Sequence, residues 1–339
     1  MIDRLIILLA TCLLASATLR AEVYELPPDG FDVIGAVSTV TARHEDTLVD
    51  IARRHGLGYQ DIVRANPDVS IWLPGEGTEV VLPTRFVLPP GPREGLVLNL
   101  AEYRMYYFPP AKEGRPSFVY SYPMSIGRMD WETPLGETKI VAMAKNPAWY
   151  PPQSVRDEHA ADGDPLPRVV PPGPQNPLGT RALRLSLPGY LIHGTNRPAG
   201  VGMRVSHGCI RMFPEDIEFL FQHVSVNVPV RIINAPVKLG WDGERLVAEV
   251  HPVLESPQPL VDASLQQIEK LDADLELPEP DTHSKEPLTQ ITERFIDVTS
   301  ERAGQLDWDL VELLVERSDG VPEAVGISIK NAATSAASE

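Results

Sequence analysis

Alternation of apolar and polar residues runs through the middle of the chain and predicts a β-rich region. The alternating runs are residues 96–100, 104–108, 118–124, 139–143, 183–187, 190–193 and 228–233. Turn-forming residues, such as Pro109 and Pro110, separate these runs. After Pro214, the residues Ile217 and Leu220 recur at helical spacing, which predicts one amphipathic helix before the last strand.

A smaller unit with a mixed pattern precedes this region, at residues 38–83. Its apolar spacing predicts a strand near Val40, a helix that begins after Thr47, a second helix at 59–65 and a closing strand at 78–82. The order is therefore β-α-α-β. With 339 residues, the chain is long enough for two or three domains, and we predict a mainly β, multidomain protein.

Three stretches lack regular periodicity and are predicted to be irregular. Residues 22–36 read as a short linker, and residues 84–94 as a proline-rich connector. Residues 146–179 form a proline-dense loop that carries the aromatic pair Trp149 and Tyr150. Because aromatic residues beside rigid prolines suit a cleft wall, we interpret this loop as a lid or wall of a substrate site.

The first 21 residues predict a secretory signal peptide. Arg4 precedes an apolar run, and small residues precede Glu22, with cleavage after Ala21 or Ala17. The apolar run is shorter than a membrane-spanning helix requires. The sequence therefore predicts an exported protein, with residues 1–21 as the signal peptide.

The C-terminal part of the chain divides at about residue 255. Residues 236–254 are predicted to form strands that pack back on the β-rich region. Residues 255–339 form an acidic, partly disordered C-terminal region in which 291–298 and 308–315 have helical spacing. This region carries most of the formal net charge of −17. A chain so acidic argues against nucleic acid as a partner.

The cysteines and histidines concentrate the candidate chemistry in one segment. The chain has two cysteines, and removal of the signal peptide leaves Cys209 alone. His207 lies two residues before Cys209, so both side chains would share a face if the segment were a strand, and His193 lies upstream. A thiol beside imidazoles suits nucleophilic acyl transfer, in which the thiolate attacks. Gly208 allows a sharp turn that frees backbone N–H groups for an oxyanion.

Two other interpretations of this cluster exist. A lone cysteine is often a small buried apolar side chain. A zinc site would use Cys209, His207 and His193 as ligands, but the spacing lacks the usual paired ligand motifs, so no metal is expected. Residue types alone leave catalysis and packing equally open.

The complete pattern resembles the active-site signature of the L,D-transpeptidase (YkuD/ErfK-type) family. It consists of His193-Gly194, a gap of mid-teens length, and then Ser206-His207-Gly208-Cys209. Arg211 stands where the family motif often has asparagine, a variant that fits its Gram-negative branch. The resemblance extends over residues 96–235 as the catalytic domain. Residues 38–83, with their G-T-x-V-x-L-P ending, resemble a LysM peptidoglycan-binding module.

The resemblance implies a role for each site residue. Cys209 would be the nucleophile, and His193 the general base and acid, held by a backbone carbonyl near Gly194. His207 would orient the loop or shape the oxyanion pocket. The substrate-binding residues would be Ser206, Gly208, Arg211 and Gly194. No cofactor is implied.

The implied reaction is transfer from tetrapeptide stems of peptidoglycan in the periplasm, with release of D-alanine. The acceptor is left open between a second stem, which gives 3→3 cross-links, a lysine of an outer-membrane lipoprotein, and water. Carbapenem-type inhibitors are expected to acylate the thiol. A non-catalytic wall-binding protein and a papain-like protease are the alternatives, and the β-rich pattern and the order of histidine and cysteine argue against the protease.

Overall fold

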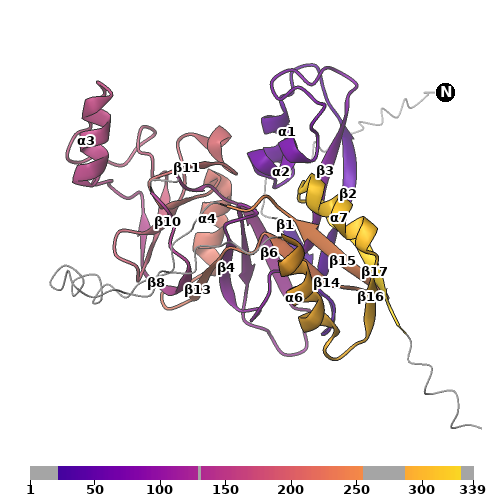
Figure 1. Cartoon of the computed structure of the whole chain (residues 1–339). Helices are drawn as coiled ribbons and strands as arrows, with labels where there is room; N and C mark the ends of the chain where they lie inside the picture. The colour runs from indigo at the N-terminus through magenta and orange to yellow at the C-terminus, as the bar shows by residue number, and fades with distance from the viewer. Residues whose placement is uncertain (1–21, 129–130, 255–286, 330–339) are drawn as a thin grey trace, which may run out of the picture.

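The computed structural model describes residues 22–128, 131–254 and 287–329. It has three parts: an N-terminal unit, a central region built on a large sheet, and a C-terminal part (Figure 1). The predicted signal peptide, residues 1–21, lies outside the described residues, as do 255–286 and 330–339 of the predicted acidic region. Among the described residues, no helix has both the length and the apolarity needed to span a membrane.

A nine-stranded sheet forms the centre of the molecule, as the alternating pattern predicts. In spatial order its strands are β1 (Glu22–Glu25), β6 (Phe118–Pro123), β5 (Arg104–Phe108), β4 (Gly95–Asn99), β13 (Pro229–Ile233), β8 (Gly136–Lys145), β9 (Arg181–Leu185), β10 (Leu191–His193) and β12 (Ile210–Arg211). The pairs β4–β13 and β10–β12 are parallel, and the others are antiparallel. Two further short strands, β7 (Ile126–Gly127) and β11 (Arg204–Ser206), pair in parallel beside the sheet.

Both faces of the central strands are buried, which explains their nearly continuous apolar sequence. In β4, Leu96 and Leu98 belong to one core, whereas Val97 between them belongs to another. Helix α4 (Pro214–His223) covers the first face with Ile217 and Leu220. It begins with proline and carries acidic residues in its first turn, as the sequence predicts.

The N-terminal unit has the predicted β-α-α-β order but extends beyond residues 38–83. Its strands β2 (Val33–Thr41) and β3 (Glu79–Val87) pair antiparallel along their whole length. Between them lie α1 (Leu48–Arg54), which Thr47 caps, and α2 (Tyr59–Arg64). This unit covers the second face of the central sheet, so its apolar core continues into that of the catalytic region.

Two predicted irregular stretches are partly regular. Residues 22–36 are not a simple linker, because β1 adds to the edge of the central sheet, with Tyr24 opposite Val119, and β2 begins at Val33. The proline-rich loop at 146–179 contains a helix, α3 (Gln153–Ala161), which stands at the end of the molecule farthest from the C-terminal part (Figure 1). The sequence analysis missed both β1 and α3.

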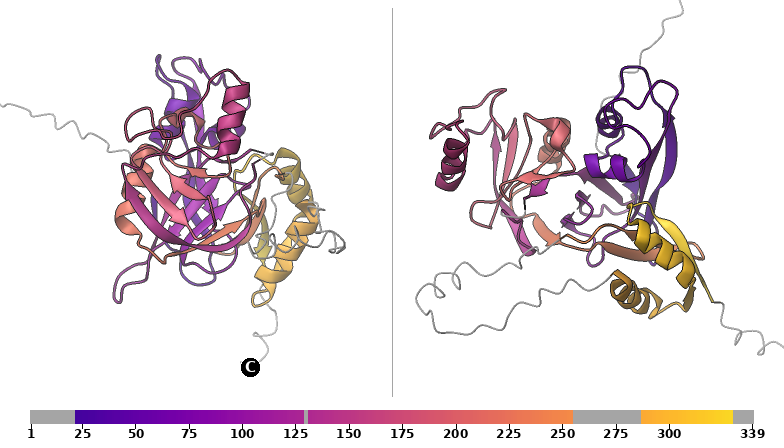
Figure 2. Two further views of the ribbon diagram at one scale, coloured as in Figure 1. Left: turned by 90° about the vertical axis from the view of Figure 1, so that its left-hand side faces the viewer. Right: turned by 45° about the horizontal axis from the view of Figure 1, so that its top comes forward.

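The C-terminal part is a small domain with its own apolar core. Its four-stranded sheet has the order β14 (Val237–Asp242), β15 (Arg245–Val250), β17 (Glu323–Ser328) and β16 (Gly304–Leu306). Helices α6 (Pro287–Thr299) and α7 (Trp308–Arg317) pack beside it (Figure 2). Residues 236–254 form strands, as predicted, but they belong to this domain rather than to an extension of the catalytic domain: β15 pairs with β17, a strand of the region predicted to be partly disordered.

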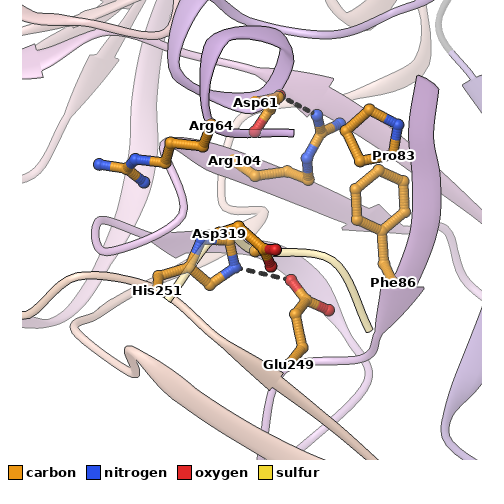
Figure 3. A pocket seen from close by; sticks show the side chains of 9 residues that line it. Asp61, Arg64, Pro83, Phe86, Arg104, Glu249, His251 and Asp319 are labelled. Atoms are coloured by element: carbon orange, nitrogen blue, oxygen red, sulfur yellow. Dashed lines mark hydrogen bonds and ion pairs between the residues drawn. The ribbon is translucent and has the colours of Figure 1, made fainter. Parts of the chain in front are cut away.

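A buried ionic cluster lies where the three parts meet. The Lys238 ammonium of β14 forms ion pairs with Glu102, next to β5, and with Glu249 of β15, the latter at 2.8 Å. His251 Nε2 lies 2.7 Å from Glu249 Oε1 (Figure 3). Buried charges need partners of opposite sign, and this cluster supplies them across the domain boundary.

Candidate active site

The parallel pair β10–β12 brings the two ends of the sequence motif together. Ile192 lies opposite Ile210, and His193 opposite Arg211. Both isoleucines are in the core of the central sheet. Because side chains alternate along a strand, His193 and Arg211 project from the other face. Cys209 directly precedes β12, and the charge of Arg211 acts on both His193 and Cys209.

A tight loop between β11 and β12 carries the cysteine. Gly208 has a φ of +91°, and a Cβ atom there would lie 2.9 Å from Tyr190 Cε1, so both conformation and space require glycine. The Gly208 carbonyl accepts a 2.8 Å hydrogen bond from Thr133 Oγ1. His207 and Cys209 lie between β11 and β12, outside both strands, so the shared strand face considered for them does not apply.

Ser206 has a role within the loop. Its side chain is buried, and its hydroxyl donates a 2.5 Å hydrogen bond to the carbonyl of Cys209. In the structure this hydroxyl holds the cysteine in place, and the expected substrate contact by Ser206 stays a prediction. This hydrogen bond spans the turn at Gly208 and stabilises its shape.

The Cys209 thiol is half-buried and uncharged at rest. It donates a 3.6 Å hydrogen bond to the carbonyl of Gly189. Burial raises the pKa of the thiol above its ordinary value, while a backbone N–H of Leu191 and the positive charge of Arg211 oppose the shift. A thiol in this state needs a base before it can act as a nucleophile.

His193 is buried and has the tautomer that a base requires. Its Nδ1 lies 2.6 Å from the carbonyl oxygen of Gly194, the type of partner that the sequence predicts. Since a carbonyl only accepts, Nδ1 carries the proton and Nε2 is free to accept one. Burial, and then the charge of Arg211, lower the pKa of His193 to about 3, so the imidazole is neutral at neutral pH. Gly194 packs against Ile217 of α4.

His207 is held by contacts with α3 and with the segment after β7. Its Nε2 lies 2.8 Å from Glu158 Oε2 of α3, and its ring meets Trp131 edge-on, with the centroids 5.2 Å apart. The other oxygen of Glu158 accepts a 2.7 Å hydrogen bond from Arg128. Trp131 and Arg128 thus contact, directly or through Glu158, the histidine of the thiol loop.

Arg211 supplies positive charge at the site. Its side chain is half-buried, and its Nε is buried with no hydrogen-bond partner in the described structure. Burial, together with the charges of Arg197 and Arg128, lowers its pKa, although it remains a cation. A guanidinium in this position can neutralise a thiolate or bind an anionic group of a substrate.

The site has the parts of a cysteine-dependent acyl-transfer enzyme. It combines a thiol, a neutral imidazole in the correct tautomer, a glycine turn with backbone N–H groups, and a cation. Sequence reasoning predicted these residues, but it missed Glu158, Tyr190 and Thr133. Those three come from separate segments, and no spacing in the sequence relates them to Cys209.

Comparison with known proteins gives this site its family. Residues 93–232 match the family model of the L,D-transpeptidase catalytic domain. The chain is 40% identical over 242 residues to the probable L,D-transpeptidase YcfS of Escherichia coli. The matched stretch covers 69% of this chain and 74% of that protein. It is 35% identical over 315 residues to the probable L,D-transpeptidase ErfK/SrfK of Salmonella typhimurium. This match covers 91% of this chain and 93% of that protein. The chain therefore belongs to the L,D-transpeptidase family of enzymes.

A search of solved structures finds members of the same family. L,D-transpeptidase 3 from Mycobacterium tuberculosis, solved with a faropenem-derived adduct, is 18% identical and covers 65% of this chain and 96% of its own. Its TM-score is 0.31. The family assignment rests on the sequence relatives.

Proposed function

We propose that the protein is a periplasmic L,D-transpeptidase that acts on tetrapeptide stems of peptidoglycan through a thioester at Cys209. The observation that carries the proposal is the state of His193: a buried, neutral imidazole with Nδ1 bound to the Gly194 carbonyl and Nε2 free. The positive charge of Arg211 acts on both this imidazole and the Cys209 thiol, which places the two groups in one electrostatic environment.

The first step forms the thioester. His193 Nε2 takes the proton of Cys209 while sulfur attacks the carbonyl carbon of the third stem residue, a meso-diaminopimelate or similar. The N–H groups of Gly208 and Cys209 face the developing oxyanion. Collapse breaks the peptide bond, and the D-alanine amine leaves with the proton from His193.

The second step regenerates the thiol. An acceptor amine gives a proton to His193 and attacks the thioester carbon, so that a new amide forms and sulfur recovers the proton. The acceptor is a second stem or the lysine of a lipoprotein, and with water the same residues would give a hydrolase. Arg211 would bind an anionic group of the stem, and Ser206, Gly194 and Gly208 would contact the substrate.

The N-terminal unit is proposed to bind glycan as a LysM module. The loop between α2 and β3 exposes Trp72 and Leu73, which have 61% and 80% of their surface accessible. An exposed indole suits stacking on a sugar ring. Trp72→Ala should weaken the pull-down of the protein by intact sacculi, with Phe118→Ala as an exposed aromatic control. Equal pull-down would contradict a glycan role for this loop.

Two further parts of the proposal follow from the family. The segment 1–21 would direct export to the periplasm. Carbapenem-type β-lactams would acylate Cys209, since an activated carbonyl can take the place of the stem. A mass increase equal to the β-lactam on the peptide that contains Cys209 would support this, and an unmodified peptide would contradict it.

Product analysis tests the function and names the acceptor. The mature protein is incubated with a disaccharide-tetrapeptide, alone and with a lipoprotein C-terminal peptide, and the products are identified by mass spectrometry. A cross-linked dimer, a peptide conjugate or a tripeptide would identify the stem, the lysine or water as acceptor. D-Alanine release that persists in Cys209→Ala, or no product with an intact thiol, would contradict the proposal, and the second result would favour a wall-binding protein.

A further inference from the structure

The carboxylate of Glu158 joins three separate segments around the thiol loop. Glu158 lies in α3, within the proline-rich segment, and its two oxygens have different partners. Oε2 lies 2.8 Å from Nε2 of His207, in the thiol loop. Oε1 lies 2.7 Å from Nη2 of Arg128, directly after β7. One side chain therefore fixes the distance between α3, the end of β7 and the loop that carries Cys209.

Two contacts determine the orientation of the His207 ring. Glu158 fixes one nitrogen, and Trp131 packs edge-on against the ring at an interplanar angle of 75°. A carboxylate only accepts hydrogen bonds, so the proton of His207 is on Nε2. Glu158 thereby selects both the orientation and the tautomer of the histidine.

Glu158 also carries negative charge in a cationic region. The guanidinium of Arg128, followed by the hydrogen bond from His207, holds the pKa of Glu158 below its ordinary value, so the carboxyl is ionised. Arg211 and Arg197 add positive charge nearby. The ionised carboxylate therefore contacts both Nε2 of His207 and the guanidinium of Arg128.

We propose that Glu158 is a positioning residue of the acyl-transfer site, which acts through His207 to hold the His207–Cys209 loop in its reactive conformation. This inference rests on the function proposed above. It explains why a helix is embedded in the proline-rich segment: α3 supplies a fixed carboxylate to the thiol loop. Loss of the contact frees the His207 ring, and a small misplacement of a nucleophile lowers turnover strongly.

A double-mutant cycle tests the inference. Glu158→Gln keeps the size of the side chain but removes its charge. D-Alanine release from a disaccharide-tetrapeptide is measured for Glu158→Gln, His207→Gln and the double variant. We expect kcat to fall by about tenfold or more in Glu158→Gln with KM little changed, because the lost contact is not with substrate. In the His207→Gln background, Glu158→Gln should have no further effect.

A matched control and a second measurement complete the test. Asp157 directly precedes Glu158 in α3. Among the described contacts, its side chain accepts a hydrogen bond only from Gln153 of the same helix, so Asp157→Asn should behave as wild type. The ring ¹⁵N chemical shifts of His207 should change in Glu158→Gln, because a neutral amide replaces the carboxylate that contacts Nε2. Equal losses in both backgrounds, or unchanged ring chemical shifts, would overturn the inference. An inactive wild-type protein would instead overturn the proposed function.

Discussion

The His193 imidazole is neutral because it is buried and faces the charge of Arg211, and this fixes how the thiol can be activated. Burial also keeps Cys209 protonated at rest. The two groups are thus a neutral pair, and in the proposed mechanism proton transfer accompanies the attack of sulfur on the substrate. A resting ion pair of thiolate and imidazolium is not favoured by this environment.

Arg211→Gln should shift the reactivity of the thiol toward higher pH. The positive charge of Arg211 lowers the pKa of Cys209, so its removal raises that pKa and leaves less thiolate at any given pH. The rate of iodoacetamide labelling, measured from pH 6 to 10, should therefore fall at pH 7 and recover at higher pH. Arg184→Gln, on the exposed side of β9, is the matched control. An unchanged profile would show that Arg211 does not act on the thiol.

Site residues could be predicted where the chemistry lies in one short stretch. Cys209, Gly208 and the backbone partner of His193 follow from residue types and from the resemblance. Glu158 could not be predicted, because it lies 49 residues from His207 in the sequence and contacts it only through the fold. Nothing in the proline-rich segment distinguishes its carboxylate from the neighbouring Asp157.

At the scale of elements, local periodicity predicts strands and helices well, and the pairing of distant strands poorly. The β-α-α-β order and α4 follow from apolar spacing and from capping residues. β1 has only four residues and is defined by its pairing with β6. β15 pairs with β17, and no local pattern could indicate such a partner.

The packing of the N-terminal unit also changes an expectation. Its removal would be expected to spare the chemistry, as for an independent module. However, Ile34 and Phe86 of this unit share a core with Tyr106 and Val119 of the central sheet. In addition, Arg53 of α1 makes a two-pronged ion pair with Glu215 of α4, with both distances 2.8 Å. Truncation would expose this core, so point substitutions such as Trp72→Ala are the better test of glycan binding.

Asp216→Asn should reduce the pH dependence of stability. Burial in α4, and then repulsion by Glu215, raise the pKa of Asp216 from 3.8 to about 8. The folded state therefore binds this proton more tightly than the unfolded state, so stability is fully present below about pH 4 and is lost as the pH rises toward 8. Asparagine resembles the protonated carboxyl, so the variant should gain stability relative to wild type from pH 5 to pH 8.

Urea unfolding at pH 5 and at pH 8 measures the difference in free energy of unfolding between Asp216→Asn and wild type. Asp29→Asn, at an exposed position, is the control and should follow wild type at both. A constant difference in free energy of unfolding between Asp216→Asn and wild type would contradict the assigned pKa.

At the scale of the whole molecule, buried charges join the three parts. Arg104 of the central sheet pairs with Asp61 of α2, and its guanidinium lies 4.2 Å from the centroid of the Phe86 ring (Figure 3). On the other side, Lys238 pairs with Glu102 and Glu249. These interactions fix the N-terminal unit and the C-terminal domain against the sheet that carries the active site.

Lys238→Met should destabilise the protein by about 3–5 kcal/mol, because two buried carboxylates lose their shared cation. The free energy of urea unfolding measures the effect, with Lys139→Met on an exposed position of β8 as the control. A loss below about 1 kcal/mol, the range of an exposed ion pair, would show that the cluster does not join the domains.

The central claim is that acyl transfer passes through Cys209 with His193 as base. Rapid quenching of the mature protein with a disaccharide-tetrapeptide, followed by peptide mapping by mass spectrometry, tests this claim most directly. The account predicts a transient adduct of the stem lacking D-alanine on the Cys209 peptide, absent in Cys209→Ala and strongly reduced in His193→Gln. D-Alanine release without an adduct on Cys209, or an adduct that forms equally fast in His193→Gln, would contradict it.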